Sequence, residues 1–81
     1  MVVEAVRWGI HGAENEWEAA QNILVALYHR LGIRLGGWDE KVWIALLYRK
    51  LQEETTDEEL QAKEIAGEIW RGCVGKRRCG A

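Results

Sequence analysis

The basic residues near the end of the chain are the first that could do chemistry. Residues 70–81, WRGCVGKRRCGA, contain no acid and four cations, namely Arg71, Lys76, Arg77 and Arg78. Residues 1–69 hold seven Lys and Arg against thirteen Asp and Glu, so the body carries a formal charge of −6 and the tail +4. Cations clustered near a glycine-rich end can contact phosphates without reading a base sequence. The tail therefore predicts binding to nucleic acid or to an acidic partner, although cations also gather where a helix ends.

Two cysteines in the same tail, Cys73 and Cys79, have two interpretations. A disulfide between them requires the helix to break near Gly75, because helical residues six apart point to different sides. Such a short loop would gain little stability from the bridge. In the other interpretation, which we favour, Cys73 is a small core residue on a helix and Cys79 is a free thiol.

A zinc site would combine these cysteines with His11 and His29, since thiolate and imidazole are the donors that zinc prefers. Structural zinc sites usually bring their ligands in closely spaced pairs. Here five residues separate the cysteines and seventeen separate the histidines. We therefore predict no metal site and no cofactor.

Carboxylates are concentrated between the second and third predicted helices, where the sequence contains Glu53, Glu54, Asp57, Glu58 and Glu59. General acid–base catalysis needs carboxylates in a concave, partly dry pocket, whereas acids at a helix start are usually solvated or capping groups. The chain has no serine, no glycine-rich phosphate loop and no clear Cys–His pair. We predict that the protein is not an enzyme, and no small-molecule substrate is evident.

The aromatic residues are dominated by tryptophan, and the chain has no phenylalanine. The five are Trp8, Trp17, Trp38, Trp43 and Trp70. They could fill one core, but tryptophan and arginine are also enriched at protein interfaces. We favour an interface with a protein partner or a further copy of the chain. The residues expected to form it are Trp38, Val42, Trp43, Leu47 and Trp8.

A first long helix is predicted over residues 13–31. Apolar residues recur at the three-and-four spacing of one helix face. They are Trp17, Ala20, Ile23, Leu24, Leu27, Tyr28 and Leu31. Asn15 followed by Glu18 has the form of a capping box, and Gly32 suits the left-handed residue that ends a helix.

The second predicted helix covers residues 38–53. With Asp39 as its N-cap, Trp38 and Trp43 would occupy the two positions of a hydrophobic staple. Its middle, VWIALLY at 42–48, is apolar almost all the way round, but its length and its charged flanks favour a helix over a strand. Such a helix is either central in its fold or covered by another subunit.

The third predicted helix covers residues 56–73. Thr55 or Thr56 caps it, each followed three residues later by glutamate. The apolar stripe consists of Leu60, Ala62, Ile65, Ala66, Ile69, Trp70 and Cys73. Residues 1–11 fit either a short helix or an extended arm, because a single strand would have nothing to pair with.

Length and composition indicate the number of domains and the class of protein. Eighty-one residues make one small domain over 1–81, and the apolar content of 48% and charged content of 30% are typical of a folded protein. The chain has neither a run of about 20 apolar residues nor a signal-peptide pattern. We expect a soluble, cytoplasmic protein that does not enter a membrane. The lack of proline and the excess of arginine over lysine are compatible with a thermophilic source.

The sequence therefore predicts an all-α fold, a compact bundle of three main helices with a short N-terminal helix or arm and a basic C-terminal tail. The expected function is non-enzymatic: a self-assembling subunit, adaptor or inhibitor that uses a tryptophan-rich apolar surface. The alternative is a nucleic-acid-associated protein, a small regulator or coat protein, whose tail contacts phosphates.

Overall fold

Four α-helices make up the part of the chain that the structure describes, and that part contains no strand. The structure is a computed structural model that describes residues 2–34 and 38–76, with side chains as far as Arg71. The helices are α1 (Val2–Ile10), α2 (Glu16–Leu31), α3 (Trp38–Glu54) and α4 (Glu58–Lys76). The predicted all-α class is confirmed, and residues 2–10 form a short helix, not an extended arm.

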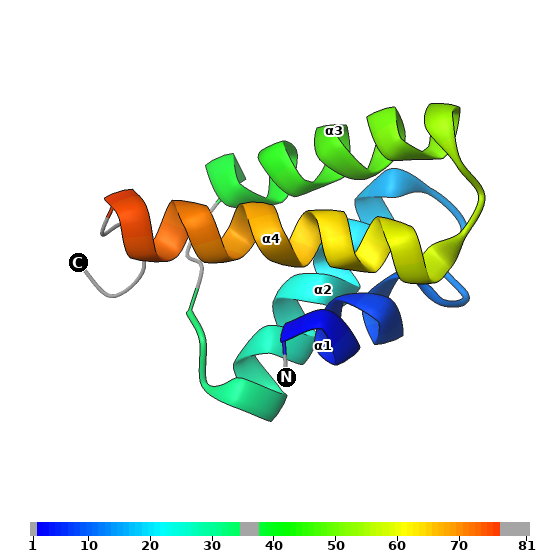
Figure 1. The fold of residues 1–81 in the computed structure, drawn as a ribbon. Helices are drawn as coiled ribbons and strands as arrows, with labels where there is room; N and C mark the ends of the chain where they lie inside the picture. The colour runs from blue at the N-terminus through cyan, green and yellow to red at the C-terminus, as the bar shows by residue number, and fades with distance from the viewer. Residues whose placement is uncertain (1, 35–37, 77–81) are drawn as a thin grey trace.

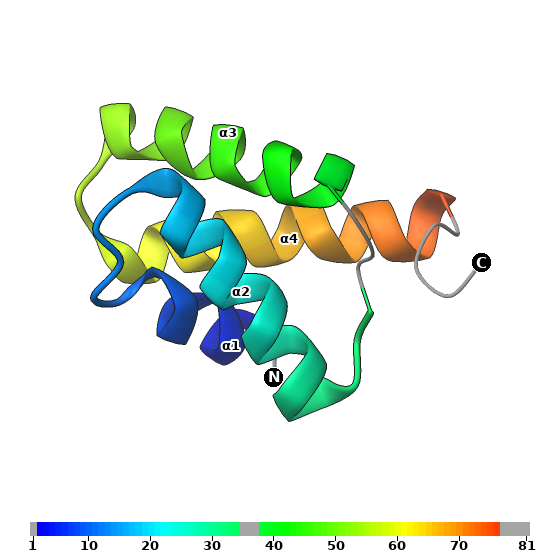
Figure 2. The same ribbon diagram turned by 180° about the vertical axis from the view of Figure 1, so that it is seen from behind.

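The helices form two hairpins, α1 with α2 and α3 with α4 (Figures 1 and 2). α1 packs against α2 and α4, and α3 packs against the same two helices from the other side. In Figure 1, α4 crosses the middle of the molecule and α3 lies along its upper edge. α3, which the sequence predicts to be apolar almost all the way round, is thus at the edge of the bundle, so one side of it has no covering helix within the described chain.

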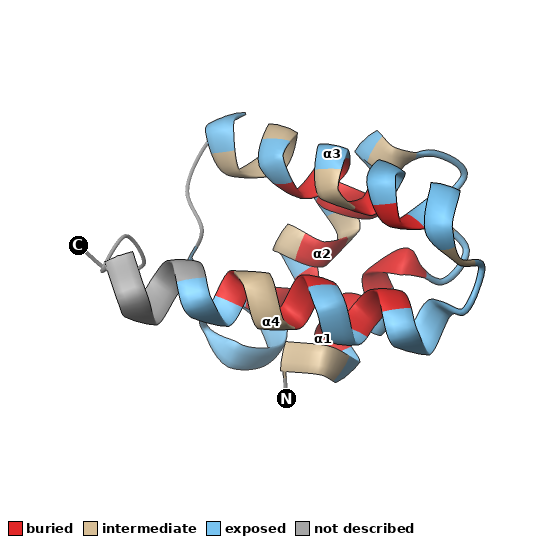
Figure 3. Cartoon of the chain, turned by 45° about the horizontal axis from the view of Figure 1, so that its top comes forward, coloured by how far each residue is buried: buried red, intermediate tan, exposed pale blue. Residues whose placement is uncertain are grey.

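Alanine and aliphatic side chains fill the core, together with the ring of Tyr48. The inward faces of all four helices contribute to it (Figure 3). The buried residues are Ala5, Val6, Ile10, Ala19, Ala20, Ile23, Ala26, Leu27, Ile44, Ala45, Tyr48, Leu51, Ala62, Ile65, Ala66 and Ile69. Gln61 of α4 is also buried. Its Nε2 donates a hydrogen bond of 2.6 Å to the carbonyl of Thr55, in the turn between α3 and α4.

α1 and α2 approach each other most closely at Gly9. A Cβ atom at this position would lie 2.6 Å from the backbone nitrogen of Ile23 and 2.8 Å from its Cα. The side-chain amide of Asn22 also donates a hydrogen bond of 3.5 Å to the Gly9 carbonyl. Since backbone atoms cannot rotate away as a side-chain tip can, the packing of α1 on α2 requires a residue without a side chain here.

The predicted capping residues of α2, Asn15 and Gly32, are confirmed. Asn15 Oδ1 accepts a hydrogen bond of 2.8 Å from the backbone N–H of Glu18, which makes it the N-cap. The Glu18 carboxylate reaches back to the N–H of Glu14, one residue before the cap, at 2.9 Å. Gly32 has φ of +68° and ends the helix in the left-handed conformation. The helix begins at Glu16, three residues later than predicted.

Asp57 caps α4, so the prediction of a threonine cap is wrong. Asp57 Oδ1 accepts hydrogen bonds from the backbone N–H groups of Glu59 at 3.0 Å and Leu60 at 3.4 Å. Thr55 Oγ1 instead accepts from the N–H of Asp57 at 3.1 Å. α4 consequently begins at Glu58 and continues to Lys76, beyond the predicted end at residue 73.

Several apolar residues that the spacing placed on buried stripes are exposed. In α2 these are Trp17, Tyr28 and Leu31, and in α4 they are Leu60 and Trp70. The buried face of α2 includes Ala19 and Ala26, so it is centred near Ile23 and the larger rings lie at its margin. Trp70 directly follows buried Ile69, and consecutive helical residues differ by about 100° in direction.

Candidate interaction surface

All five tryptophans are on the surface of the protein. The exposed fractions are 51% for Trp8, 41% for Trp17, 67% for Trp38, 39% for Trp43 and 63% for Trp70. The interpretation that they fill a core lacking phenylalanine is therefore wrong. Alanine, isoleucine and leucine fill that core instead, which leaves the largest apolar side chains for the outside.

Trp17 and Trp38 form an exposed stacked pair. Their ring centroids are 5.7 Å apart and their planes differ by 15°. Trp17 lies in the first turn of α2 and Trp38 is the first residue of α3, so the pair joins the starts of two helices. The sequence predicts that Trp38 precedes an Asp39 N-cap and forms a hydrophobic staple with Trp43. That assignment is wrong, since Trp38 is itself helical and its ring packs on Trp17.

Arginine side chains cover two other exposed rings. The Arg30 guanidinium lies 5.5 Å from the centroid of Trp8, and the Arg34 guanidinium lies 5.4 Å from that of Tyr28. These are cation–π distances, and each would contribute about 0.5–1 kcal/mol at an exposed site. The rings of Trp8 and Tyr28 thus already have a partner on one face within the chain.

Trp8 also borders an open hollow of about 440 Å³ between α1, the end of α2 and the start of α4. Its lining residues are Glu4, Arg7, Trp8, His11, Arg30 and Glu58. His11 Nδ1 lies 3.2 Å from Glu58 Oε1, and Arg7 Nη1 lies 3.9 Å from Glu59 Oε1. Three of the five clustered carboxylates are thus engaged in structural contacts: Asp57 caps α4, Glu58 contacts His11 and Glu59 contacts Arg7.

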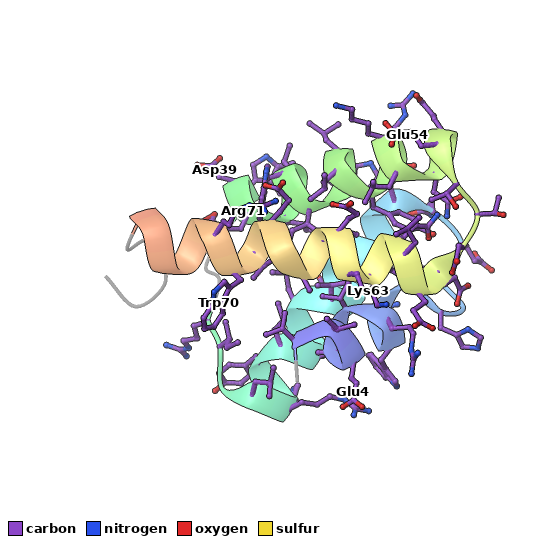
Figure 4. The ribbon with its side chains drawn as sticks, in the orientation of Figure 1. Glu4, Asp39, Glu54, Lys63, Trp70 and Arg71 are labelled. Carbon is purple, nitrogen blue, oxygen red and sulfur yellow. The ribbon has the colours of Figure 1, made fainter. Side chains whose placement is uncertain are left out.

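The outer face of α3, defined here as Asp39, Trp43, Leu46 and Lys50, has no covering helix in the described chain. Trp43 is 39% and Leu46 is 54% exposed, and both charged residues are exposed. Figure 4 shows Asp39 at the edge of α3 that faces away from α4. Of the predicted interface residues, Val42 and Leu47 are half-buried beside this face, and Leu47 packs against the core.

The predicted phosphate-binding cations lie mostly outside the described side chains. Arg71 is exposed on α4 and its Nη2 forms an ion pair with Glu68 Oε2, three residues earlier. In Figure 4, Trp70 and Arg71 leave opposite sides of α4. The side chains of Lys76 and Cys73, and all of Arg77, Arg78 and Cys79, fall outside the described residues. The predicted basic site therefore stays a prediction, and so do both interpretations of the cysteines, the favoured free thiols and the Cys73–Cys79 disulfide.

Comparisons with known proteins give no family for this chain. No protein-family model matches it, and searches of curated proteins and of solved structures found no match. Within residues 2–34 and 38–76, no helix has both the length and the apolarity to cross a membrane.

Proposed function

We propose that this chain is a protein-interaction module, a small helical subunit that associates with further copies of itself through its tryptophan-rich surface. The observation that supports the proposal is the exposure of all five tryptophans around an aliphatic core. Tryptophan buries a large area with little loss of conformational freedom, and it is among the residue types most enriched at the energetic centres of interfaces.

The distribution of apolar residues supports the same proposal. Besides the tryptophans, the exposed large hydrophobic residues include Val25, Tyr28, Leu31, Leu46 and Leu60. A partner that covers such residues would add the apolar burial that a chain of 81 residues lacks on its own.

The mass of the wild-type protein in solution tests this proposal. At about 10–100 µM, the range in which modest interfaces form, light scattering should give a mass above the 9.3 kDa of one chain. A mass of one chain throughout that range would contradict self-association.

The charge distribution of the sequence favours a second candidate, a nucleic-acid-associated protein. Residues 70–81 carry +4 and the remainder −6, so phosphates would meet the tail rather than the body. At about 50 mM salt, anisotropy of a labelled DNA or RNA duplex should rise on addition of the full chain. Deleting residues 74–81 should abolish that rise, and a full-length chain that leaves the anisotropy unchanged would exclude this candidate.

A further inference from the structure

We infer that the outer face of α3 pairs in antiparallel orientation with the same face of a second copy of the chain. This inference rests on the proposed self-association and names the surface and the geometry that would produce it. The pairing is twofold symmetric, so each contact between the copies occurs twice.

The four residues of this face form one line along α3. Asp39, Trp43, Leu46 and Lys50 are spaced by four, three and four residues, and helical residues at these spacings are neighbours on the same side. The opposite side of α3 is buried against α2 and α4 through Ile44, Ala45, Tyr48 and Leu51. The line is therefore directed away from the bundle, where a second helix can approach it.

The chemical order along the line is acid, apolar, apolar, base. When a second copy of α3 is turned end for end, Asp39 of each copy lies opposite Lys50 of the other. Trp43 of each copy then lies opposite Leu46 of the other, at the centre. A parallel, in-register pair would instead place Asp39 against Asp39 and Lys50 against Lys50, which is unfavourable. The face is complementary to itself in the antiparallel orientation.

The charges at the two ends of the face are available for such contacts. Among the described residues, neither Asp39 nor Lys50 makes an ion pair or a side-chain hydrogen bond, whereas Glu58, Glu59 and Glu68 all have side-chain partners within the chain. Trp43 differs in the same way from Trp8, Trp17 and Trp38, and shares with Trp70 the lack of a ring or guanidinium partner within the part of the chain that the structure describes. Trp17 stacks on Trp38 and Trp8 is covered by Arg30, but no ring or guanidinium stacks on Trp43 in the described chain.

Charge exchange tests the pairing. Asp39→Lys places two cations opposite each other at both ends of the symmetric pair, and Lys50→Glu places two acids there. Sedimentation equilibrium should show that each variant dimerises at least about tenfold more weakly than the wild type. An equimolar mixture of the two variants should regain wild-type affinity, because the lysine introduced in one copy then faces the glutamate introduced in the other. The double variant Asp39→Lys/Lys50→Glu should also regain it.

Glu40→Lys and Arg49→Glu are the matched controls. They make the same charge changes one residue away, about 100° around the helix from the face, and should leave dimerisation within about twofold of wild type. Circular dichroism of every variant verifies that α3 still forms. Leu46→Glu provides a variant without any change at the helix start, and it too should weaken the dimer.

The outcomes separate this inference from the proposed function. If the wild type is heavier than one chain but both charge variants retain its mass, the α3 pairing is wrong and self-association uses another surface. The pairing is also wrong if the controls weaken the dimer as much as the face variants do. A wild type with the mass of one chain removes the proposed self-association together with the pairing.

Discussion

Replacing Gly9 with alanine is expected to lower the free energy of unfolding by about 2–3 kcal/mol. The added Cβ would lie 2.6 Å from the backbone nitrogen of Ile23, a distance at which one of the two helices must move. Alanine is a better helix former than glycine by about 1 kcal/mol, but overpacking against a backbone outweighs that gain. Denaturant unfolding followed by circular dichroism measures the change.

Gly67→Ala is the matched control, because it makes the same substitution within a helix of the same protein. A Cβ at Gly67 would meet nothing within 4 Å. Only the helix propensity then changes, and the variant should gain up to about 1 kcal/mol. Association adds to apparent stability, so all chains are compared at one protein concentration. If the two alanine variants shift stability in the same direction, the close approach of α1 and α2 at Gly9 is wrong.

The second large loss of stability is expected from replacing a buried leucine and not from replacing a tryptophan. Leu27→Ala should cost about 3 kcal/mol, because the side chain is fully buried and its removal leaves a cavity. For a domain of this length, whose whole stability is about 4–12 kcal/mol, such a loss is a large fraction. A drop in the denaturant midpoint with an unchanged m-value would identify it as a loss of stability alone.

Trp70→Ala is the control for the stability loss expected from Leu27→Ala. A core tryptophan replaced by alanine costs about 3–5 kcal/mol, but Trp70 is mostly exposed, and we expect a loss below about 1 kcal/mol. The order of the two variants is therefore the reverse of the order of their side-chain sizes. If Trp70→Ala destabilises the protein as much as Leu27→Ala does, Trp70 belongs to the core.

Local signals predicted much of the secondary structure. Asn15 and Gly32 define the ends of α2 because a capping side chain and a left-handed residue act within one or two turns of the chain. The start of α4 differs from the predicted one because Thr55, Thr56 and Asp57 can all serve as caps. The choice among them depends on how the turn after α3 folds. In that turn the Thr55 hydroxyl accepts a hydrogen bond from the backbone N–H of Asp57.

The position of the tryptophans was not predictable from the same signals. In α2 the spacing of large apolar residues gave a plausible stripe, yet alanines at positions 19 and 26 turn the buried face elsewhere. In α4 the predicted stripe held the buried Ala62 and Ala66 but also took in Leu60 and Trp70, which are exposed. Alanine permits close helix packing but contributes little to an apolar pattern. Only the arrangement of all four helices decides which side of each is covered.

The residues of the candidate interface were also predicted only in part. The sequence pointed to Trp38, Trp43 and Trp8, all of which are exposed, and to Val42 and Leu47, which border the outer face of α3. It missed Asp39, Leu46 and Lys50 as part of that surface, because the outer side of an apolar helix is defined only once its packed side is known. The spacing of four, three and four residues was the available signal.

The most direct test of the central claim is the mass of the wild-type chain across a dilution series. Because the large exposed rings would be covered by another copy, we predict a transition from the mass of one chain, 9.3 kDa, toward twice that value or more as the concentration rises from about 1 to 100 µM. A mass that stays at 9.3 kDa over the whole series would contradict the claim that the tryptophan-rich surface serves self-association.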